Sequence, residues 1–103
     1  MRFLVIAKGL DYPDRTKMGD APIRANRYRE RLVEEGRIFF HAHVVGHRAH
    51  MWIYDVASVD ELDRIMAEDP IFPYLENSPQ ILPLASLDRM KEREQKWIER
   101  AKA

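Results

Sequence analysis

Two short runs of β-branched and aromatic residues, separated by only a few positions, constrain the fold of this chain more than any other feature. The runs span residues 37–45 and 49–56, and the string VGHR joins them. Gly46 suits the first central position of a two-residue type II′ turn, so the two runs predict a β-hairpin. An isolated hairpin is barely stable in water, so further strands and helices have to complete it.

The turn sets the register of the predicted hairpin. With Gly46 and His47 in the turn, Val45 pairs with Arg48. Further along the strands, three pairs are expected on one face: His43 with His50, His41 with Trp52, and Phe39 with Tyr54. A one-residue bulge would change this pairing and turn part of one strand over.

The two faces of the hairpin differ in polarity. One face is uniformly apolar and is expected beneath the helices; it carries Ile38, Phe40, Ala42, Val44, Met51 and Ile53. The other face, with its histidines and aromatic rings, is too apolar for water and too polar for a simple core. A second copy of the chain would cover it if two sheets packed face to face around a shared cavity. We therefore expect a homodimer, with three histidines facing inward and His47 on the turn.

Helices and strands flank the hairpin in the sequence. An apolar run at residues 2–7 predicts a first strand, and residues 8–19 predict a long loop, typical of a binding loop or lid. Asp20 is expected to cap a helix that ends at Gly36. The string SVDE after the hairpin is a capping box, in which Ser58 and Glu61 start a second helix that Pro70 ends.

Towards the C-terminus, residues 80–85 predict a fourth strand, and Pro83 in its middle indicates an edge position or a bulge. A charged helix then starts at Ser86 or Asp88. The order β-α-β-β-α-β is the ferredoxin-like arrangement, an α+β fold with a four-stranded antiparallel sheet. The 103 residues are expected to form a single domain, with an α+β unit at residues 1–86 and a helix at 87–103 that packs on a neighbour.

Charge and composition exclude several classes of function. Lys plus Arg and Asp plus Glu both number 17, so no net charge draws the chain to nucleic acid or to an anionic membrane. The absence of cysteine excludes disulfides, thiolate chemistry and Cys-based zinc sites. The apolar run near the N-terminus has only five residues, too few for a membrane span or a signal peptide. A cytoplasmic protein is therefore expected.

The four histidines of the chain all lie between His41 and His50, and they are the candidates for chemistry. An imidazole with a pKa of about 6.5 can accept or donate a proton at neutral pH. His43 and His50 are therefore candidate catalytic residues, and the alternative is a cross-strand pair packed at a dimer interface. His41, His43 and His50 could instead bind a metal ion, but no carboxylate completes that set, so no metal site is predicted.

Aromatic and basic residues are the candidates for substrate binding: His41, Phe39, Trp52, Tyr54, Phe72, Tyr74 and Lys8. The aromatic rings could stack on a substrate, or pack within a dimer instead. Phe72 and Tyr74 could form a wall of the cleft or a structural plug, and Lys8 could bind an anionic group.

Several local strings resemble the muconolactone isomerase-like members of the dimeric α+β barrel superfamily. The matching positions between residues 36 and 59 are Gly36, Gly46, His47, Ala49, Asp55, Val56, Ser58 and Val59. The string FPY at residues 72–74 follows the second helix at the family's spacing. The string EDP at residues 68–70 and the helix RYRERLVEEGRI also resemble the related YCII-like proteins. The resemblance covers residues 1–88 and not the terminal helix.

The resemblance implies a homodimer with a cleft in each half of a barrel, which could assemble into a larger ring. It also implies a cofactor-free proton shift on an unsaturated lactone that bears a carboxylate. Such a reaction needs a base, a donor to the enolate oxygen and a cation for the carboxylate. The family carries arginines at the positions of Phe39 and His43, and an amide at that of His50, so the carboxylate clamp is weaker in this chain. This difference argues against muconolactone itself as the substrate.

Three functions therefore stay open. The first is a small cofactor-free isomerase or lyase, in which His43 or His50 moves a proton while aromatic neighbours stack on the substrate. The second is a non-catalytic small-molecule-binding or assembly protein with the same fold. The third is a haem-dependent or cofactor-free monooxygenase, since both occur in the same superfamily.

Overall fold

The computed structural model describes residues 1–8, 18–47, 49–75 and 78–102. Its elements are β1 (Arg2–Lys8), α2 (Ala21–Glu34), β2 (Ile38–Val44), β3 (Ala49–Asp55), α3 (Val59–Glu68), the 3₁₀-helix η1 (Phe72–Tyr74), β4 (Gln80–Leu84) and α4 (Leu87–Lys102). The four strands form one sheet in the order β2-β3-β1-β4, and all neighbours are antiparallel. The predicted ferredoxin-like α+β fold is confirmed, and β4 with Pro83 lies at an edge as expected.

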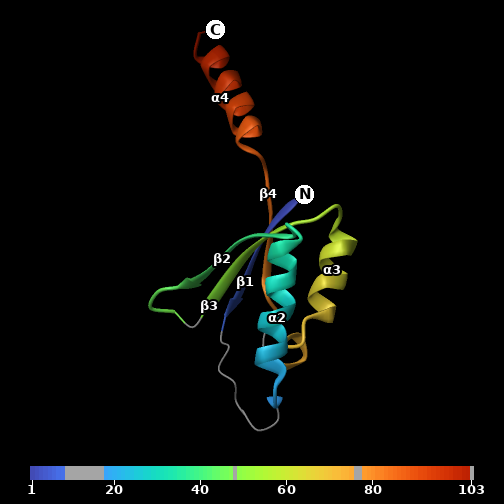
Figure 1. The fold of residues 1–103 in the computed structure, drawn as a ribbon. Helices are drawn as coiled ribbons and strands as arrows, with labels where there is room; N and C mark the ends of the chain where they lie inside the picture. Colours follow the sequence, from blue (N-terminus) through green and yellow to red (C-terminus); the bar gives the residue numbers. More distant parts are fainter. Residues whose placement is uncertain (9–17, 48, 76–77, 103) are drawn as a thin grey trace.

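The sheet is covered on one face only. Helices α2 and α3 lie side by side against that face, while the other face carries no helix (Figure 1). The Tyr28 hydroxyl of α2 donates to the Ile65 carbonyl oxygen of α3 at 2.7 Å, which joins the two helices. Helix α4 extends from the end of β4 away from the rest of the chain. No helix among the described residues is long and apolar enough to cross a membrane.

The helix boundaries follow local sequence signals. Gly36 has a φ of 75°, and its N–H donates to the Val33 carbonyl oxygen at 3.0 Å, so it ends α2 as predicted. The Ser58 side chain accepts from the Glu61 N–H at 3.1 Å and starts α3. Asp20 precedes α2, but its side chain makes no capping hydrogen bond, because its carboxylate pairs with Arg24 at 2.9 Å instead. The predicted loop at 8–19 lies largely outside the described residues.

The hairpin of β2 and β3 keeps most of the predicted register. His43 pairs with His50 and His41 pairs with Trp52, as the turn position predicts. The pairing shifts between Ile38 and Phe40, where a β-bulge places Ile38 opposite Tyr54. The predicted pair of Phe39 with Tyr54 is therefore wrong, because the bulge leaves Phe39 without an opposite residue.

The turn itself differs from the predicted type. The His47 N–H donates to the Val44 carbonyl oxygen at 3.2 Å, so these residues close a turn with Gly46 at its third position. Gly46 has a φ of 77°. Glycine adopts a positive φ at the third position of a turn without steric cost. The prediction of Gly46 at the first central position was wrong, although the strand register is unchanged. The predicted pairing of Val45 with Arg48 falls on residue 48, which lies outside the described residues.

The prediction of which hairpin face lies under the helices was wrong. Trp52 and Tyr54 pair with Val5 and Phe3 of β1, and all four are buried in the main core together with residues of α2 and α3. Of the apolar residues expected there, only Ile38 joins that core. Large aromatic rings bury more surface than Val or Met, and Arg29 of α2 lies over the Trp52 ring. The histidine face therefore lies on the helix side of the sheet.

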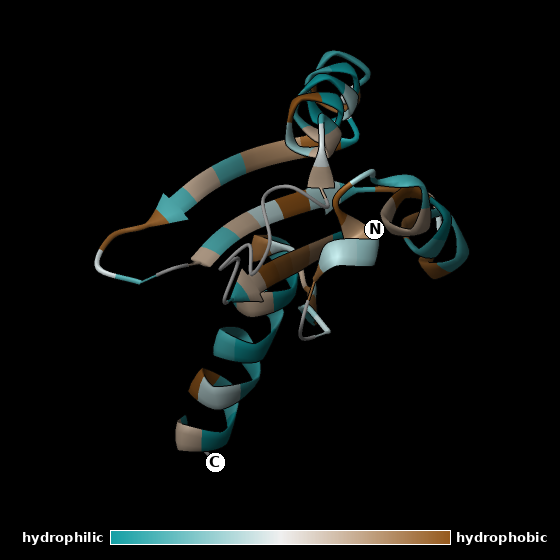
Figure 2. Cartoon of the chain, turned by 90° about the horizontal axis from the view of Figure 1, so that it is seen from below, coloured by the Kyte–Doolittle hydropathy of each residue, from teal (hydrophilic) through white to brown (hydrophobic). Residues whose placement is uncertain are grey.

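The opposite face of the sheet, called the open face from here on, is apolar along the middle of its strands, with Arg2, Lys8, Asp55 and Gln80 at the strand ends. Strand alternation assigns to it Leu4, Ile6, Phe40, Ala42, Val44, Met51, Ile53, Leu82 and Leu84. Phe40, Leu82 and Leu84 are exposed, and the strands carry brown, hydrophobic segments in Figure 2. An apolar surface of this extent marks an interaction site.

Candidate active site

Three histidines and a tryptophan from β2 and β3 form one ring cluster on the helix side of the sheet. The His41 and His50 rings both stack on the indole of Trp52, with centroids at 5.3 and 5.8 Å. The His43 ring meets that of His50 edge-on at 4.9 Å. The cluster follows from the strand pairing, because side chains opposite each other or two residues apart share a face. His41, His43, His50 and Trp52 are called the histidine–tryptophan cluster below.

Burial decreases across the cluster from the indole outwards. Trp52 is 4% exposed, His50 is half-buried, and His41 and His43 are exposed. Burial lowers the pKa of His50, and the neighbouring His43, His41 and Arg29 lower it further. Burial and Arg29 also lower the pKa of His41. Both imidazoles are therefore neutral at pH 7, the form that accepts a proton from a substrate.

An arginine from α2 lies against the indole. The Cζ atom of Arg29 lies 4.8 Å from the centroid of the Trp52 ring, a cation–π contact. The Nε and Nη2 atoms of Arg29 both approach Oδ2 of Asp69 at 3.0 Å. The Arg29 and Asp69 side chains are only 16% and 10% exposed, so the pair is largely shielded from solvent. The second carboxylate oxygen of Asp69 accepts from the Ile71 N–H at 3.0 Å, which fixes its orientation.

Arg29 and Asp69 were missed as functional residues in the sequence. They lie 40 positions apart, on α2 and at the end of α3, so no local spacing connects them. The available signal was the string EDP at residues 68–70, in which Asp69 stands before the proline that ends α3. The pair brings a fixed cation to the edge of the histidine–tryptophan cluster.

Arg29 lines two cavities. A small, partly open cavity of about 30 Å³, called the small cavity below, lies between the sheet and the helices, with Trp52, Tyr54, Asp69 and Phe72 among its walls. An open groove of about 420 Å³ lies between α2 and β2, bordered by His41 and Asn26 among others. The first has room for a water molecule or a single polar atom, and only the second has the size of a small-molecule site.

Two residues that line the small cavity carry notable polar groups. The Nε1 atom of Trp52 is buried and has no hydrogen-bond partner among the described residues. Burial raises the pKa of the Tyr54 hydroxyl, so this group stays protonated throughout the physiological range. Both groups are therefore hydrogen-bond donors in a largely apolar wall, and an unpartnered buried donor favours binding of an acceptor.

The structure brings together some of the predicted site residues and separates others. His41, His43, His50 and Trp52 form the cluster, and Tyr54 and Phe72 line the small cavity. Phe39 points elsewhere, because the bulge places its ring under Arg2, with 4.4 Å between Cζ and the ring centroid.

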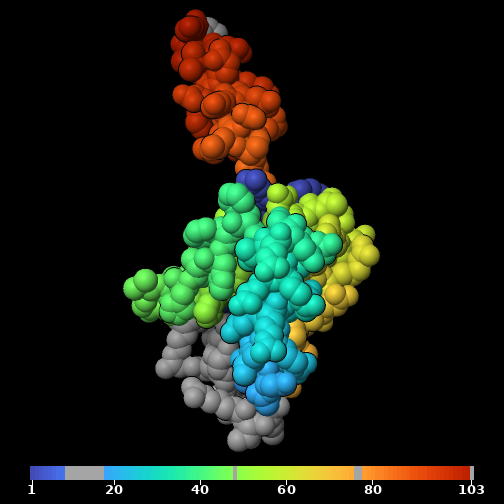
Figure 3. Space-filling model, in the orientation of Figure 1, coloured from blue at the N-terminus to red at the C-terminus, as the bar shows by residue number. Residues whose placement is uncertain are grey.

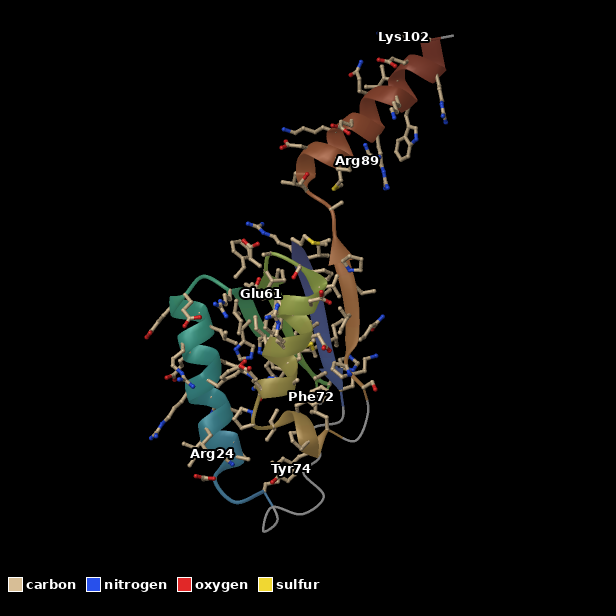
Figure 4. The ribbon with its side chains drawn as sticks, turned by 90° about the vertical axis from the view of Figure 1, so that its right-hand side faces the viewer. Arg24, Glu61, Phe72, Tyr74, Arg89 and Lys102 are labelled. Atoms are coloured by element: carbon tan, nitrogen blue, oxygen red, sulfur yellow. The ribbon has the colours of Figure 1, made fainter. Side chains whose placement is uncertain are left out.

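Lys8 and Tyr74 also lie apart from the cluster. Lys8 is exposed and opposite Ala49, on the strand positions of the open face. Tyr74 belongs to η1 at the end of the molecule opposite α4, and it is not among the residues that line the small cavity (Figure 4). Within the described ranges, no three His, Asp or Glu side chains converge as metal ligands.

Comparisons with known proteins place this chain in a family. The family model described as muconolactone delta-isomerase matches residues 1–88. A crystal structure of muconolactone isomerase at 3.3 Å resolution is 25% identical, with a TM-score of 0.69 over 84% of this chain and 90% of that chain. No curated protein sequence matches this chain.

A second solved structure shares the fold at lower identity. It is the 5-chloro-2-hydroxyhydroquinone dehydrochlorinase of Burkholderia phenoliruptrix AC1100 in complex with 2,5-dihydroxybenzoquinone. That protein is 17% identical, with a TM-score of 0.53 over 82% of this chain and 94% of its own. The family match covers the whole α+β unit and ends at the start of α4. The chain therefore belongs to the muconolactone delta-isomerase family.

Proposed function

We propose that this protein is a cofactor-free isomerase or lyase that moves a proton on a small unsaturated ring compound, with His50 as the general acid and base. The observation that carries the proposal is the position of His50. It is half-buried, its pKa is lowered, its ring contacts His43 and Trp52, and Arg29 lies nearby. A neutral imidazole next to a fixed cation is the arrangement that proton abstraction beside a carbonyl needs.

The proton shift requires no redox step. An imidazole nitrogen of His50 removes a proton from the carbon beside a conjugated carbonyl, and the bonding electrons move to the carbonyl oxygen. The resulting imidazolium then returns the proton to another carbon of the same conjugated system. If that system bears a halide, loss of the halide completes an elimination instead. His43 is within ring contact of His50 and can hold the proton between the two transfers.

The negative charge that develops on the substrate needs a cation and a donor. Arg29 of α2 supplies the cation. It would replace the family's arginines at the positions of Phe39 and His43, which this chain lacks. Trp52, whose ring lies against this cation, carries an unpartnered buried N–H donor. The open groove beside His41 has room for the ring, and the small cavity has room only for an oxygen atom. His41, which borders the groove, would then stack on the substrate.

The two solved relatives indicate the class of substrate. One acts on muconolactone and the other is bound to a dihydroxybenzoquinone, so both take small oxygenated rings. The weaker carboxylate clamp of this chain favours a less charged ring than muconolactone. A conjugated lactone, enone or hydroxyquinone fits these requirements.

Exchange of substrate protons in D₂O tests the proposal. Unsaturated lactones and hydroxyquinones, muconolactone included, are incubated with the protein, and proton loss is followed by NMR. We expect exchange or turnover of at least one ring, reduced at least 100-fold in His50→Gln. His47→Gln is the matched control, because this histidine lies on the exposed turn outside the cluster. Ligand binding without exchange, or equal rates in both variants, would leave the non-catalytic binding protein as the function.

We also propose that the chain forms a homodimer through the open face rather than through the histidine face. The support is the exposed apolar surface of β2 and β4, which a second sheet packed face to face would cover. Phe40→Asp should convert a dimer into a monomer in light scattering coupled to size exclusion. Val45→Asp is the control, because Val45 is apolar and exposed but lies on the turn. A monomeric wild-type chain would refute the dimer.

A further inference from the structure

Helix α4 stands apart from the rest of the described chain. Every residue from Leu87 to Lys102 is exposed, and the helix is joined to the sheet only through a narrow connection (Figure 3). The family match ends at residue 88, so this helix is an addition to the shared fold. An isolated helix of this length is only marginally stable in water, so its stability depends on a surface to pack against.

The helix carries an apolar stripe suited to such packing. Leu87, Met90, Trp97 and Ile98 are 73%, 60%, 68% and 41% exposed. Their spacing places them along one side of the helix, and Glu94 is the polar residue within that stripe. Arg89 and Glu92 instead form an ion pair at 2.7 Å. A Trp exposed to this degree on a helix without neighbours indicates an interface residue.

A groove of about 530 Å³ lies at the base of α4, and it is called the end groove below. Phe39, Ile53 and Leu84 give it an apolar floor, and Arg2 and Asp55 lie at its border. Met1 and residues 85–87 complete its walls. The bulge in β2 is what places Phe39 here, so the end groove continues the open face to the end of the sheet.

The helix cannot fill the end groove of its own chain as it stands. Leu87 already forms part of the wall, and the helix axis leads away from the sheet. Trp97 lies ten residues further on, which corresponds to about 15 Å along the axis. The outer half of the stripe, which includes Trp97 and Ile98, therefore needs an apolar groove on another molecule to pack against.

The charges of the two surfaces agree with this pairing. Arg2 is half-exposed, and its Nε lies 3.8 Å from the Asp55 carboxylate, a long ion pair that leaves the guanidinium accessible. Glu94 is the single carboxylate on the stripe, between Met90 and Trp97. Glu94 of one copy can therefore pair with Arg2 of another while the apolar side chains on both sides enter the end groove.

We infer that α4 of each copy docks its stripe into the end groove of a second copy, and that the exchange is reciprocal. A two-fold axis makes this possible, because each chain carries both surfaces. The second copy is the favoured occupant because the groove continues the open face and because Glu94 and Arg2 complement each other. The exchange would join the two copies by a contact that lies outside the family's shared fold. This contact would come in addition to the proposed pairing of the open faces.

Engineered cysteines test the inference directly, because the chain contains none of its own. Copies with Ala85→Cys in the end groove are mixed with differently tagged copies with Ile98→Cys on the stripe. We expect a disulfide between the two tagged chains on mild oxidation. Glu99→Cys is the matched control on the opposite side of the helix, and it should cross-link at least tenfold less.

The same cysteines distinguish exchange from a helix that folds back. With the helix as described, Leu87 and Ile98 lie about 16 Å apart along the axis, and Ala85 precedes the helix, so positions 85 and 98 of one chain are too far apart for a disulfide. A chain that carries both cysteines and closes within a single copy would overturn the inference. Equal cross-linking of Ile98→Cys and Glu99→Cys, or none by either, would overturn it too.

A charge exchange supplies the second test. Glu94→Arg and Arg2→Glu should each weaken self-association about tenfold in sedimentation equilibrium, and the double variant should recover most of the loss. Glu92→Arg, on the opposite side of the helix, should have no effect. A dimer that Phe40→Asp dissociates but that neither charge variant weakens would support the open-face interface and reject the docking of α4. Catalysis tests the site independently, because α4 contributes no residue to it.

Discussion

Arg29 lies over the indole of Trp52, with its Cζ 4.8 Å from the ring centroid, while the same guanidinium holds Asp69 at 3.0 Å. The arginine thereby connects α2, the end of α3 and the middle of the sheet. A guanidinium that stacks on one group and pairs with another keeps further N–H donors for a ligand. This relationship gives the site a fixed cation without an arginine on β2 or β3.

Replacement of Asp69 tests how strongly the pair contributes to stability. Asp69→Asn keeps the oxygen that accepts from the Ile71 N–H but leaves Arg29 without a counter-charge. We expect the free energy of unfolding to fall by about 2 kcal/mol, because the pair is largely shielded from solvent. Asp20→Asn is the control, since it breaks an exposed pair with Arg24 and should cost less than about 0.5 kcal/mol. Equal losses in urea denaturation would contradict this account.

Replacement of Trp52 separates its hydrogen-bond donor from its packing. Trp52→Phe removes the unpartnered Nε1–H and keeps an aromatic ring against Arg29 and the histidines. The free energy of unfolding should change by less than about 2 kcal/mol, because no hydrogen bond is lost while some ring volume is. The catalytic rate should fall by about 10- to 100-fold if this donor binds the developing oxyanion. A rate equal to that of the wild type would remove Trp52 from the chemistry.

The histidines give stability a defined pH dependence. In the folded chain the pKa of His41 and of His50 lies below the ordinary value of about 6.5 for imidazole, chiefly because of burial. Between the folded pKa and 6.5, the unfolded chain binds more protons, so stability rises with pH in this window. Their contribution is complete above pH 6.5 and is lost as the pH falls through the folded value.

Thermal unfolding between pH 5 and pH 8 measures this dependence. The midpoint should decrease on acidification from pH 7, and His50→Gln should show a smaller decrease than the wild type. His47→Gln should retain the full dependence, because it lies outside the cluster. An identical slope in His50→Gln would show that other groups cause the effect.

The capping box of α3 offers a test that is independent of the site. Ser58→Ala removes the oxygen that accepts from the Glu61 N–H and should lower the free energy of unfolding by about 1 kcal/mol. Glu61→Gln should cost less, because an amide oxygen can still accept from the Ala57 N–H. Chemical denaturation of both variants gives the comparison, and a larger loss in Glu61→Gln would contradict it.

The fold could be predicted because its signals are local. The turn residues, the period-two strands and the capping box each lie within a few positions of the element they define, and the sheet follows from their order. The pairs His43–His50 and His41–Trp52 follow from the turn alone. The bulge at Phe39 has no such signal, so the pairing beyond it was predicted wrongly.

The site could be predicted only in part because its contacts join distant segments. Alternation correctly groups His41, His43, His50 and Trp52, but it does not say which side the helices cover. Hydrophobicity favours the Ile- and Met-bearing face as the core, yet Trp52 and Tyr54 bury more surface and are the residues beneath the helices. The Arg29–Asp69 pair beside Trp52 becomes visible only when α2 and the end of α3 are placed in space.

The β-bulge at Phe39 divides β2 into two parts. Ile38 and His41 are three positions apart, an odd spacing, yet both face the helices, because the bulge absorbs one residue between them. Changes in chain length before the bulge can therefore be accommodated without rotating the imidazoles to the other side of the sheet. The start of the strand is free to vary while its histidine-bearing half keeps its orientation.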